Sequence, residues 1–233
     1  MKFLFILIIG AGLWACSSVS VKSVNQESIP VKGEEQANSK IEAEIKPYRD
    51  SMKAEMNEVI AVADTNFIVE RPFGNLNNWV ADAVFVGETK TIRMTLPFFA
   101  LLNTGGIRAT INKGNVTIGD IFKIAPFDNE IVWVKMPISS LSKIEEYLKK
   151  SGGEPLANAK LVNGKLIVNG KMKDATEIMI ITSDYLANGG DNMNFFEDRI
   201  EIIPTGKLLR DVLIQEARIQ GTLQSNPENR ITF

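Results

Sequence analysis

Residues 98–108 read Phe98-Phe-Ala-Leu-Leu-Asn-Thr-Gly-Gly-Ile-Arg108, an apolar run that stops at a polar turn with two glycines. A short apolar run ended by turn residues predicts a strand that is buried on both faces. Gly105 and Gly106 let backbone amides approach an anion closely, and Arg108 offers a planar fork of donors that suits phosphate. A glycine pair beside an arginine is also common in ordinary turns, so the motif alone leaves both interpretations open.

The elements around this strand alternate between the helical and the extended type. Apolar spacing predicts helices over 39–62, 76–85, 118–125, 141–151 and 206–220. The expected caps are Asn75 or Asn77 for the second helix, Ser139 or Ser140 for the fourth, and Thr205 or Gly206 for the last. Strands are expected over 131–136 and 177–183, and Asn163-Gly164 predicts a tight hairpin over 160–168. The sequence therefore predicts a mixed α/β, α+β-like domain whose sheet is partly antiparallel.

Two more loops carry polar and aromatic residues where elements end. They read Pro126-Phe-Asp-Asn129 and Tyr185-Leu-Ala-Asn-Gly-Gly-Asp191. Two aromatic rings on separate loops can sandwich a planar base, while Asn129 reads its edge and Asp191 accepts hydrogen bonds from ribose hydroxyls. The alternatives are a Phe127 that fills the core under a proline turn, a Tyr185 packed at a strand end, and an Asx turn at Asp191 after Gly190.

The order of these three segments resembles that of the C-terminal domain of the 5′-nucleotidase family, over most of the chain after about residue 40. Leu76-Asn-Asn-Trp-Val-Ala-Asp-Ala83 is similar to the start of a helix in that family, and Thr205-Gly-Lys-Leu-Leu-Arg-Asp211 to its closing helix. The resemblance implies a layered α/β/β/α domain that binds the nucleoside part of a nucleotide substrate.

The resemblance also implies roles for individual residues. Phe127 and Tyr185 are expected to stack on the base, although phenylalanine is also usual at the second position. Asn129 would read the base, and Asp191 would hold the ribose. Asn103 and Arg108 would contact phosphate or the sugar edge, and Arg71 would match a further phosphate-contacting arginine of the family. The full predicted binding set is Arg71, Asn103, Gly105, Gly106, Arg108, Phe127, Asn129, Tyr185, Gly190 and Asp191.

The chain contains no histidine. The metallophosphoesterase domain of the family enzymes holds two metals through Asp-x-His, Gly-Asn-His-Asp/Glu and Gly-His-x-His motifs, none of which occurs here. We therefore expect no metal and no catalytic residue in this chain. The resemblance implies a separately encoded metallophosphoesterase partner that supplies two divalent metals. One alternative is a nucleotide- or nucleoside-binding lipoprotein without catalysis. The other is a domain that keeps the fold without the binding function, in which Phe127 and Tyr185 only pack.

The first residues predict that the protein is located in the cell envelope. Lys2 precedes an apolar run over 3–15 that ends in Leu13-Trp-Ala-Cys16, which resembles a lipoprotein signal with lipid attachment at Cys16. The alternative is an ordinary secretory segment with a chance cysteine. Residues 17–38 have the polar composition of a flexible tether, which leaves 39–233 as one domain. We expect a lipid-anchored protein on the periplasmic face or the outer membrane.

The composition sets two further bounds on the function. Hydrophobic residues make up 45% of the chain, which is enough for a substantial core, and the formal net charge is only -2. Because the charge is near neutral and the chain lacks a Lys/Arg run, we expect no nucleic-acid partner.

Overall fold

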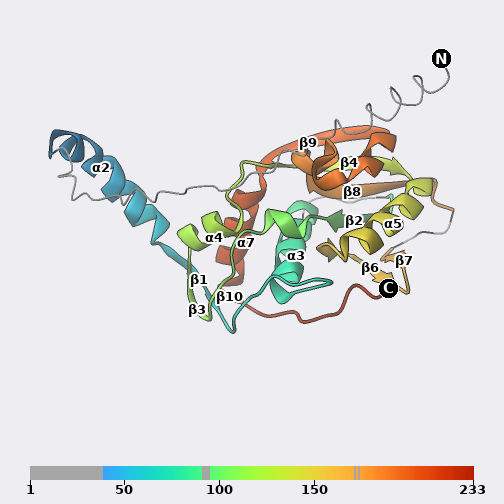
Figure 1. Ribbon diagram of the computed structural model, residues 1–233, viewed down its shortest axis with the longest axis horizontal. Helices are drawn as coiled ribbons and strands as arrows, with labels where there is room; N and C mark the ends of the chain where they lie inside the picture. Colours follow the sequence, from blue (N-terminus) through green and yellow to red (C-terminus); the bar gives the residue numbers. More distant parts are fainter. Residues whose placement is uncertain (1–38, 91–94, 171, 173) are drawn as a thin grey trace, which may run out of the picture. The chain divides into compact units, whose positions relative to one another are not determined.

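The computed structural model describes residues 39–90, 95–170, 172 and 174–233 (Figure 1). The predicted signal segment, Cys16 and the tether lie outside the described residues. The chain divides into two units, 1–44 and 45–233, and the second unit contains all the sheets. Among the described helices, none has the length and apolar character needed to cross a membrane.

The helix expected over 39–62 is shorter than predicted. Helix α2 (Ser39–Met56) includes Pro47, and strand β1 (Val59–Ala63) follows it. The prediction of helix over 59–62 was therefore wrong. The β-branched residues of this segment favour a strand, and β1 satisfies its backbone by pairing antiparallel with β3 (Gly114–Thr117) and parallel with β10 (Thr222–Leu223).

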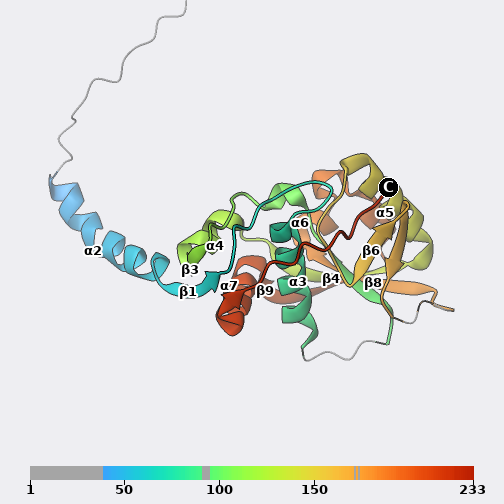
Figure 2. The same ribbon diagram turned by 90° about the horizontal axis from the view of Figure 1, so that it is seen from below.

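A five-stranded mixed sheet forms the centre of the second unit, in the order β5-β2-β8-β4-β9. Figure 2 labels its strands β8, β4 and β9. Its strands are β5 (Leu156–Ala157), β2 (Phe98–Leu101), β8 (Glu177–Ser183), β4 (Glu130–Pro137) and β9 (Glu201–Leu208). β2 and β8 are parallel, and the other pairs are antiparallel. The mixed α/β class that the sequence predicts is confirmed.

The expected hairpin is formed by β6 (Ala159–Val162) and β7 (Lys165–Val168). Its turn residues Asn163 and Gly164 both have positive φ, at 50° and 70°, as a tight primed turn requires.

The two faces of the central sheet bury two separate cores. The longer helices are α3 (Asn75–Thr89), α5 (Leu141–Ser151) and α7 (Leu209–Gln220), and the short ones are α4 (Ile118–Ile124) and α6 (Asp184–Ala187). One core joins residues of α3, α4, α7 and the three-stranded sheet to one face, for example Leu76, Val84 and Ile181. The other joins α5, α6 and the hairpin to the opposite face, for example Phe99, Ile144 and Leu161. Successive residues of β8 therefore alternate between two apolar environments, which explains why the run over 178–181 is wholly apolar.

Several helix ends differ from the expected caps. α3 begins after Gly74 rather than at Asn75 or Asn77. The Asn75 side chain instead accepts from the backbone N–H of Ile68 and thereby fixes the preceding loop. Ser140 is in the N-cap position of α5 but makes no side-chain cap, whereas Gly152 ends that helix with a left-handed φ of 79°, as expected.

The last helix begins later than the sequence indicates. Residues Thr205 and Gly206 belong to β9, and α7 starts at Leu209. Thr205 donates its hydroxyl to the carbonyl of Ile131 on the neighbouring strand, and Gly206 has a φ of 70°, beside an irregularity in the β4–β9 pairing. The two residues thus form a bulge rather than a helix cap.

Candidate functional site

The three loops singled out in the sequence meet in the folded chain. Eight of the ten predicted binding residues line one hollow of ≈ 290 Å³: Asn103, Gly105, Gly106, Arg108, Phe127, Asn129, Tyr185 and Asp191. This volume is close to the lower end of the range for small-molecule sites, which begins at about 300 Å³.

Strand order explains why the loops meet. β2 and β8 are parallel neighbours, so Asn103 and Tyr185 follow adjacent strands at the same edge of the sheet. β4 is antiparallel to β8, with Ile131 opposite Ser183, so the start of β4 lies beside the end of β8. Asn129 directly precedes β4 and therefore reaches the same edge. Ligand sites of α/β proteins commonly lie at the carboxyl ends of parallel strands.

The first loop is a tight 3-10 turn, η1 (Thr104–Gly106), which Asn103 precedes. A Cβ atom at Gly106 would lie 2.6 Å from Oδ1 of Asn103, so a side chain at position 106 would displace the Asn103 amide from its present position. Arg108 donates from Nη1 to the carbonyl of Gly105 at 3.1 Å, which holds its guanidinium beside the turn. The backbone N–H of Thr104 donates to Oε2 of the buried Glu154 at 2.6 Å.

The second loop is held in place by Arg210, which sequence analysis missed. This residue of α7 is 8% exposed and donates from Nη2 to Oδ1 of Asp128 at 2.6 Å. Its Nη1 atom points to the carbonyls of Ala125 and Pro126, both at 3.4 Å, and its guanidinium lies 4.1 Å from the ring centre of Phe122. A signal was present in the sequence, because Arg210 lies on the same helical stripe as the core residues Leu213 and Ala217.

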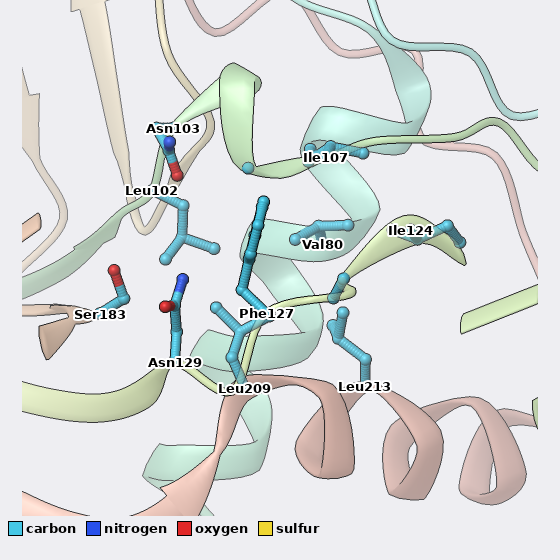
Figure 3. Close-up of a pocket in the computed structure, with 12 residues that line it drawn as sticks. Val80, Leu102, Asn103, Ile107, Ile124, Phe127, Asn129, Ser183, Leu209 and Leu213 are labelled. Carbon is cyan, nitrogen blue, oxygen red and sulfur yellow. The ribbon is translucent and has the colours of Figure 1, made fainter. Parts of the chain in front are cut away.

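Phe127 stands at the mouth of an apolar recess. Figure 3 shows its ring between Leu102 and Asn129 on one side and Val80 and Ile107 on the other. The side chain is 51% exposed, so the interpretation of Phe127 as a buried core residue is wrong. An aromatic ring that is half exposed over an apolar floor offers one face for stacking.

The third loop presents Asp191 with both carboxylate oxygens already hydrogen-bonded. Asn103 donates from Nδ2 to Oδ2 at 2.6 Å, and the Tyr185 hydroxyl donates to Oδ1 at 2.9 Å. The Tyr185 oxygen also accepts from the backbone N–H of Asp191 at 3.3 Å. Asp191 has a left-handed φ of 51°, and its carbonyl accepts from the Tyr147 hydroxyl at 3.1 Å. These bonds replace the Asx turn that was the alternative for this residue.

Tyr147 was also missed by sequence analysis. Burial, together with the negative charges of Glu154 and Asp191, raises the pKa of Tyr147 to about 12. The hydroxyl is therefore protonated near neutral pH and remains a donor to Asp191. No short motif marks this residue, because its partner is 44 positions away in the chain.

Two of the predicted residues do not line the hollow. A Cβ atom at Gly190 would lie 2.5 Å from Cε1 of Tyr185, so Gly190 makes room for the aromatic ring. Arg71 lines a neighbouring hollow of ≈ 610 Å³ that also touches Asp191. Its Nη2 atom donates to Oε1 of Glu154 at 2.7 Å and its Nε to the carbonyl of Gly153 at 3.1 Å. The guanidinium is thus bound within the protein, and contact of Arg71 with phosphate stays a prediction.

The described part of the chain contains no group of three or more His, Cys, Asp or Glu side chains that could hold a metal ion. The residues present therefore do not fit the two-metal centre of a metallophosphoesterase, and no hydrolytic step is assigned to them. The hollow instead offers aromatic faces, amides, one carboxylate and one guanidinium, which are groups that bind and orient a ligand.

The fold and the hollow together define a mixed α/β domain with an aromatic and polar hollow at one edge of its central sheet. Residues 59–155 match the family model of the 5′-nucleotidase C-terminal domain. A curated apyrase of Tabanus yao is 26% identical over 226 residues, which cover 81% of this chain and 40% of the apyrase. Protein UshA of Yersinia enterocolitica is 26% identical over 149 residues, which cover 58% of this chain and 27% of UshA. The chain thus spans less than half the length of these curated relatives.

The solved structures agree on the fold. The 5′-nucleotidase precursor of Thermus thermophilus superposes with a TM-score of 0.65 at 20% identity, over 83% of this chain and 43% of that protein. The NAD nucleotidase of Haemophilus influenzae has a TM-score of 0.63 at 18% identity, with 83% and 41% coverage. The family model and the curated relatives make residues 59–155 similar to the C-terminal domain of 5′-nucleotidases, and the solved structures show that the fold is shared.

Proposed function

We propose that this chain recognises the nucleoside part of a nucleotide for a 5′-nucleotidase-type phosphohydrolase. The observation that carries the proposal is the convergence of eight residues from three separate loops on one hollow. These loops are far apart in sequence and are brought together by the order β2-β8-β4. The family comparisons independently point to a nucleotide as the ligand class.

Each group in the hollow has a task in this proposal. Phe127 and Tyr185 are 51% and 48% exposed, so both rings offer a face to a planar base. The Asn129 amide can both donate and accept, as reading a base edge requires. Asp191 accepts from the ribose, while Asn103 and Arg108 face phosphate or the sugar edge. Binding of this kind contributes to catalysis by orienting the substrate against a reactive group.

The reactive group is supplied from elsewhere in this proposal. Two divalent metals held by a separately encoded metallophosphoesterase would activate water and polarise the phosphate. The lipid attached at Cys16 would keep the recognition domain at the cell envelope, on the periplasmic face or the outer membrane. Support for this division of tasks comes from the lack of histidine in the chain and of a metal-binding cluster in its described part.

The binding step is tested by calorimetric titration of the mature chain with adenosine and AMP at millimolar concentration. We expect weak binding that falls by about 1–3 kcal/mol in Phe127→Ala, which is the usual contribution of a base stacked on an aromatic side chain. Phe233→Ala is the matched control, because Phe233 is 56% exposed and does not line the hollow. Equal binding by the two variants would contradict stacking of the base on Phe127. The two aromatic rings would then only pack, and the domain would share the fold of the family without its binding function.

A second candidate is a nucleotide- or nucleoside-binding lipoprotein without a catalytic partner. The observation that favours it is the hollow itself, which is formed wholly by residues of this chain. The two candidates differ in what happens on mixing with a secreted metallophosphoesterase encoded beside this gene. The split enzyme predicts that AMP hydrolysis by the partner rises at least tenfold when this chain is added, and that this chain alone is inert with Mg²⁺, Mn²⁺, Co²⁺ or Zn²⁺. An unchanged rate with the wild-type chain would favour the non-catalytic candidate.

A further inference from the structure

The hydroxyl group of Tyr185 takes no part in base stacking, yet it both donates and accepts a hydrogen bond. It donates its only proton to Oδ1 of Asp191 at 2.9 Å and accepts from the backbone N–H of the same residue at 3.3 Å. The group therefore has no proton left for a ligand. Phenylalanine would present the same ring for stacking, so the hydroxyl must be explained by its effect on Asp191.

The other carboxylate oxygen of Asp191 also has a donor, since Asn103 reaches Oδ2 at 2.6 Å. Each oxygen of a carboxylate can accept two hydrogen bonds, and each oxygen of Asp191 has already accepted one. Charge-assisted bonds of this kind are stronger than neutral ones, so a ligand hydroxyl gains less from an oxygen that already accepts such a bond. The two oxygens differ in how their donors are held. The Tyr185 hydroxyl is fixed to Asp191 by two hydrogen bonds, whereas Asn103 makes one, so a ribose hydroxyl displaces the donor at Oδ2 more readily than the donor at Oδ1.

Resting on the proposed function, we propose that Tyr185 is a specificity-determining residue that withholds Oδ1 of Asp191 from the ribose. Asp191 then reads one ribose hydroxyl through Oδ2 rather than both hydroxyls through its two oxygens. The ligand class that follows is broader than ribonucleosides alone. The domain accepts a nucleoside that lacks one of its 2′ and 3′ hydroxyls about as well as one that has both.

Asp191 stays in position without the Tyr185 hydroxyl. Its side chain is still held by Asn103, and its carbonyl by the Tyr147 hydroxyl at 3.1 Å. The Tyr185 ring is still packed against Gly190, where the closest approach leaves no room for a Cβ atom. Tyr185→Phe therefore frees an acceptor and leaves the loop and the stacking face intact.

The test is a titration of wild type and Tyr185→Phe with adenosine, 2′-deoxyadenosine, 3′-deoxyadenosine and 2′,3′-dideoxyadenosine. Wild type should bind one of the two monodeoxy nucleosides within about twofold of adenosine, since the loss of one hydrogen bond to a charged group would otherwise cost about tenfold. Tyr185→Phe should bind adenosine about three- to tenfold more tightly than wild type, because a second charge-assisted bond forms. Its affinity for the dideoxy nucleoside should not change.

Tyr147→Phe is the matched control. It removes a hydroxyl that bonds to the same residue, but at the backbone carbonyl rather than at the carboxylate. The ratio of adenosine affinity to dideoxyadenosine affinity should stay at the wild-type value in this variant. A ratio that rises in Tyr147→Phe as it does in Tyr185→Phe would overturn the inference, because loosening of the loop would then be the cause.

The remaining outcomes separate this inference from the proposed function. If wild type binds adenosine and Tyr185→Phe has an equal or a smaller ratio, the inference is wrong while nucleoside recognition stands. If neither protein binds any of the four nucleosides, the proposed function is wrong and the inference fails with it.

Discussion

Gly190 shows how the lack of one side chain sets the geometry of a binding loop. A Cβ atom there would lie 2.5 Å from Cε1 of Tyr185, 2.6 Å from Cζ and 2.6 Å from the Tyr185 carbonyl oxygen. We expect Gly190→Ala to destabilise the domain by about 1–3 kcal/mol, which is the usual cost of an overpacked contact. The displaced ring would also leave the position in which it stacks on the base, so nucleoside affinity should fall. Thermal unfolding and titration measure the two effects.

The role of the ring in this cost can be isolated with Tyr185→Ala. Of the three atoms nearest to the alanine methyl at position 190, the backbone carbonyl oxygen alone remains in that background, so the cost of Gly190→Ala should shrink without vanishing. A cost that is equal in both backgrounds would show that the backbone, and not the ring, requires glycine at position 190.

At the scale of single elements, the sequence predicts what local patterns control. The apolar runs of β2 and β8 and the Asn163-Gly164 turn follow from neighbouring residues, and the structure contains each of them. The segments over 59–62 and 206–208 were predicted as helix and are strand. Their strand pairing depends on partners elsewhere in the chain, which local spacing does not report.

The residues of the candidate site also divide into those that local patterns predict and those that depend on distant partners. The loop residues could be found in the sequence because they belong to three short motifs, and eight of them line the hollow. Arg210, Glu154 and Tyr147 could not be found in this way, since each acts on a loop from a distant element. The helical stripe of α7 marks Arg210 as a buried position, but the partner of a buried arginine or glutamate is identified only when the fold places the two side chains together.

At the scale of the whole molecule, the proposed binding site and the predicted lipid site lie in different parts of the chain. The residues around the hollow lie between positions 103 and 191, whereas the predicted lipid site is Cys16. The described helices do not include one that could cross a membrane. In the proposed arrangement, the polar residues 17–38 act as a tether, so the membrane does not constrain the ligand that the domain selects.

This separation leads to a prediction for Cys16→Ser. Lipid attachment requires the thiol, so the variant should leave the membrane fraction or stay unprocessed, while adenosine affinity stays at the wild-type value. Membrane fractionation and titration of the same preparation measure both effects. Ser18→Ala is the matched control, because it alters a neighbouring small residue and keeps the thiol. If the Cys16→Ser chain were cleaved normally and still sedimented with membranes, the anchor would have to lie elsewhere, since a lipid at Cys16 is the sole attachment that the proposal invokes.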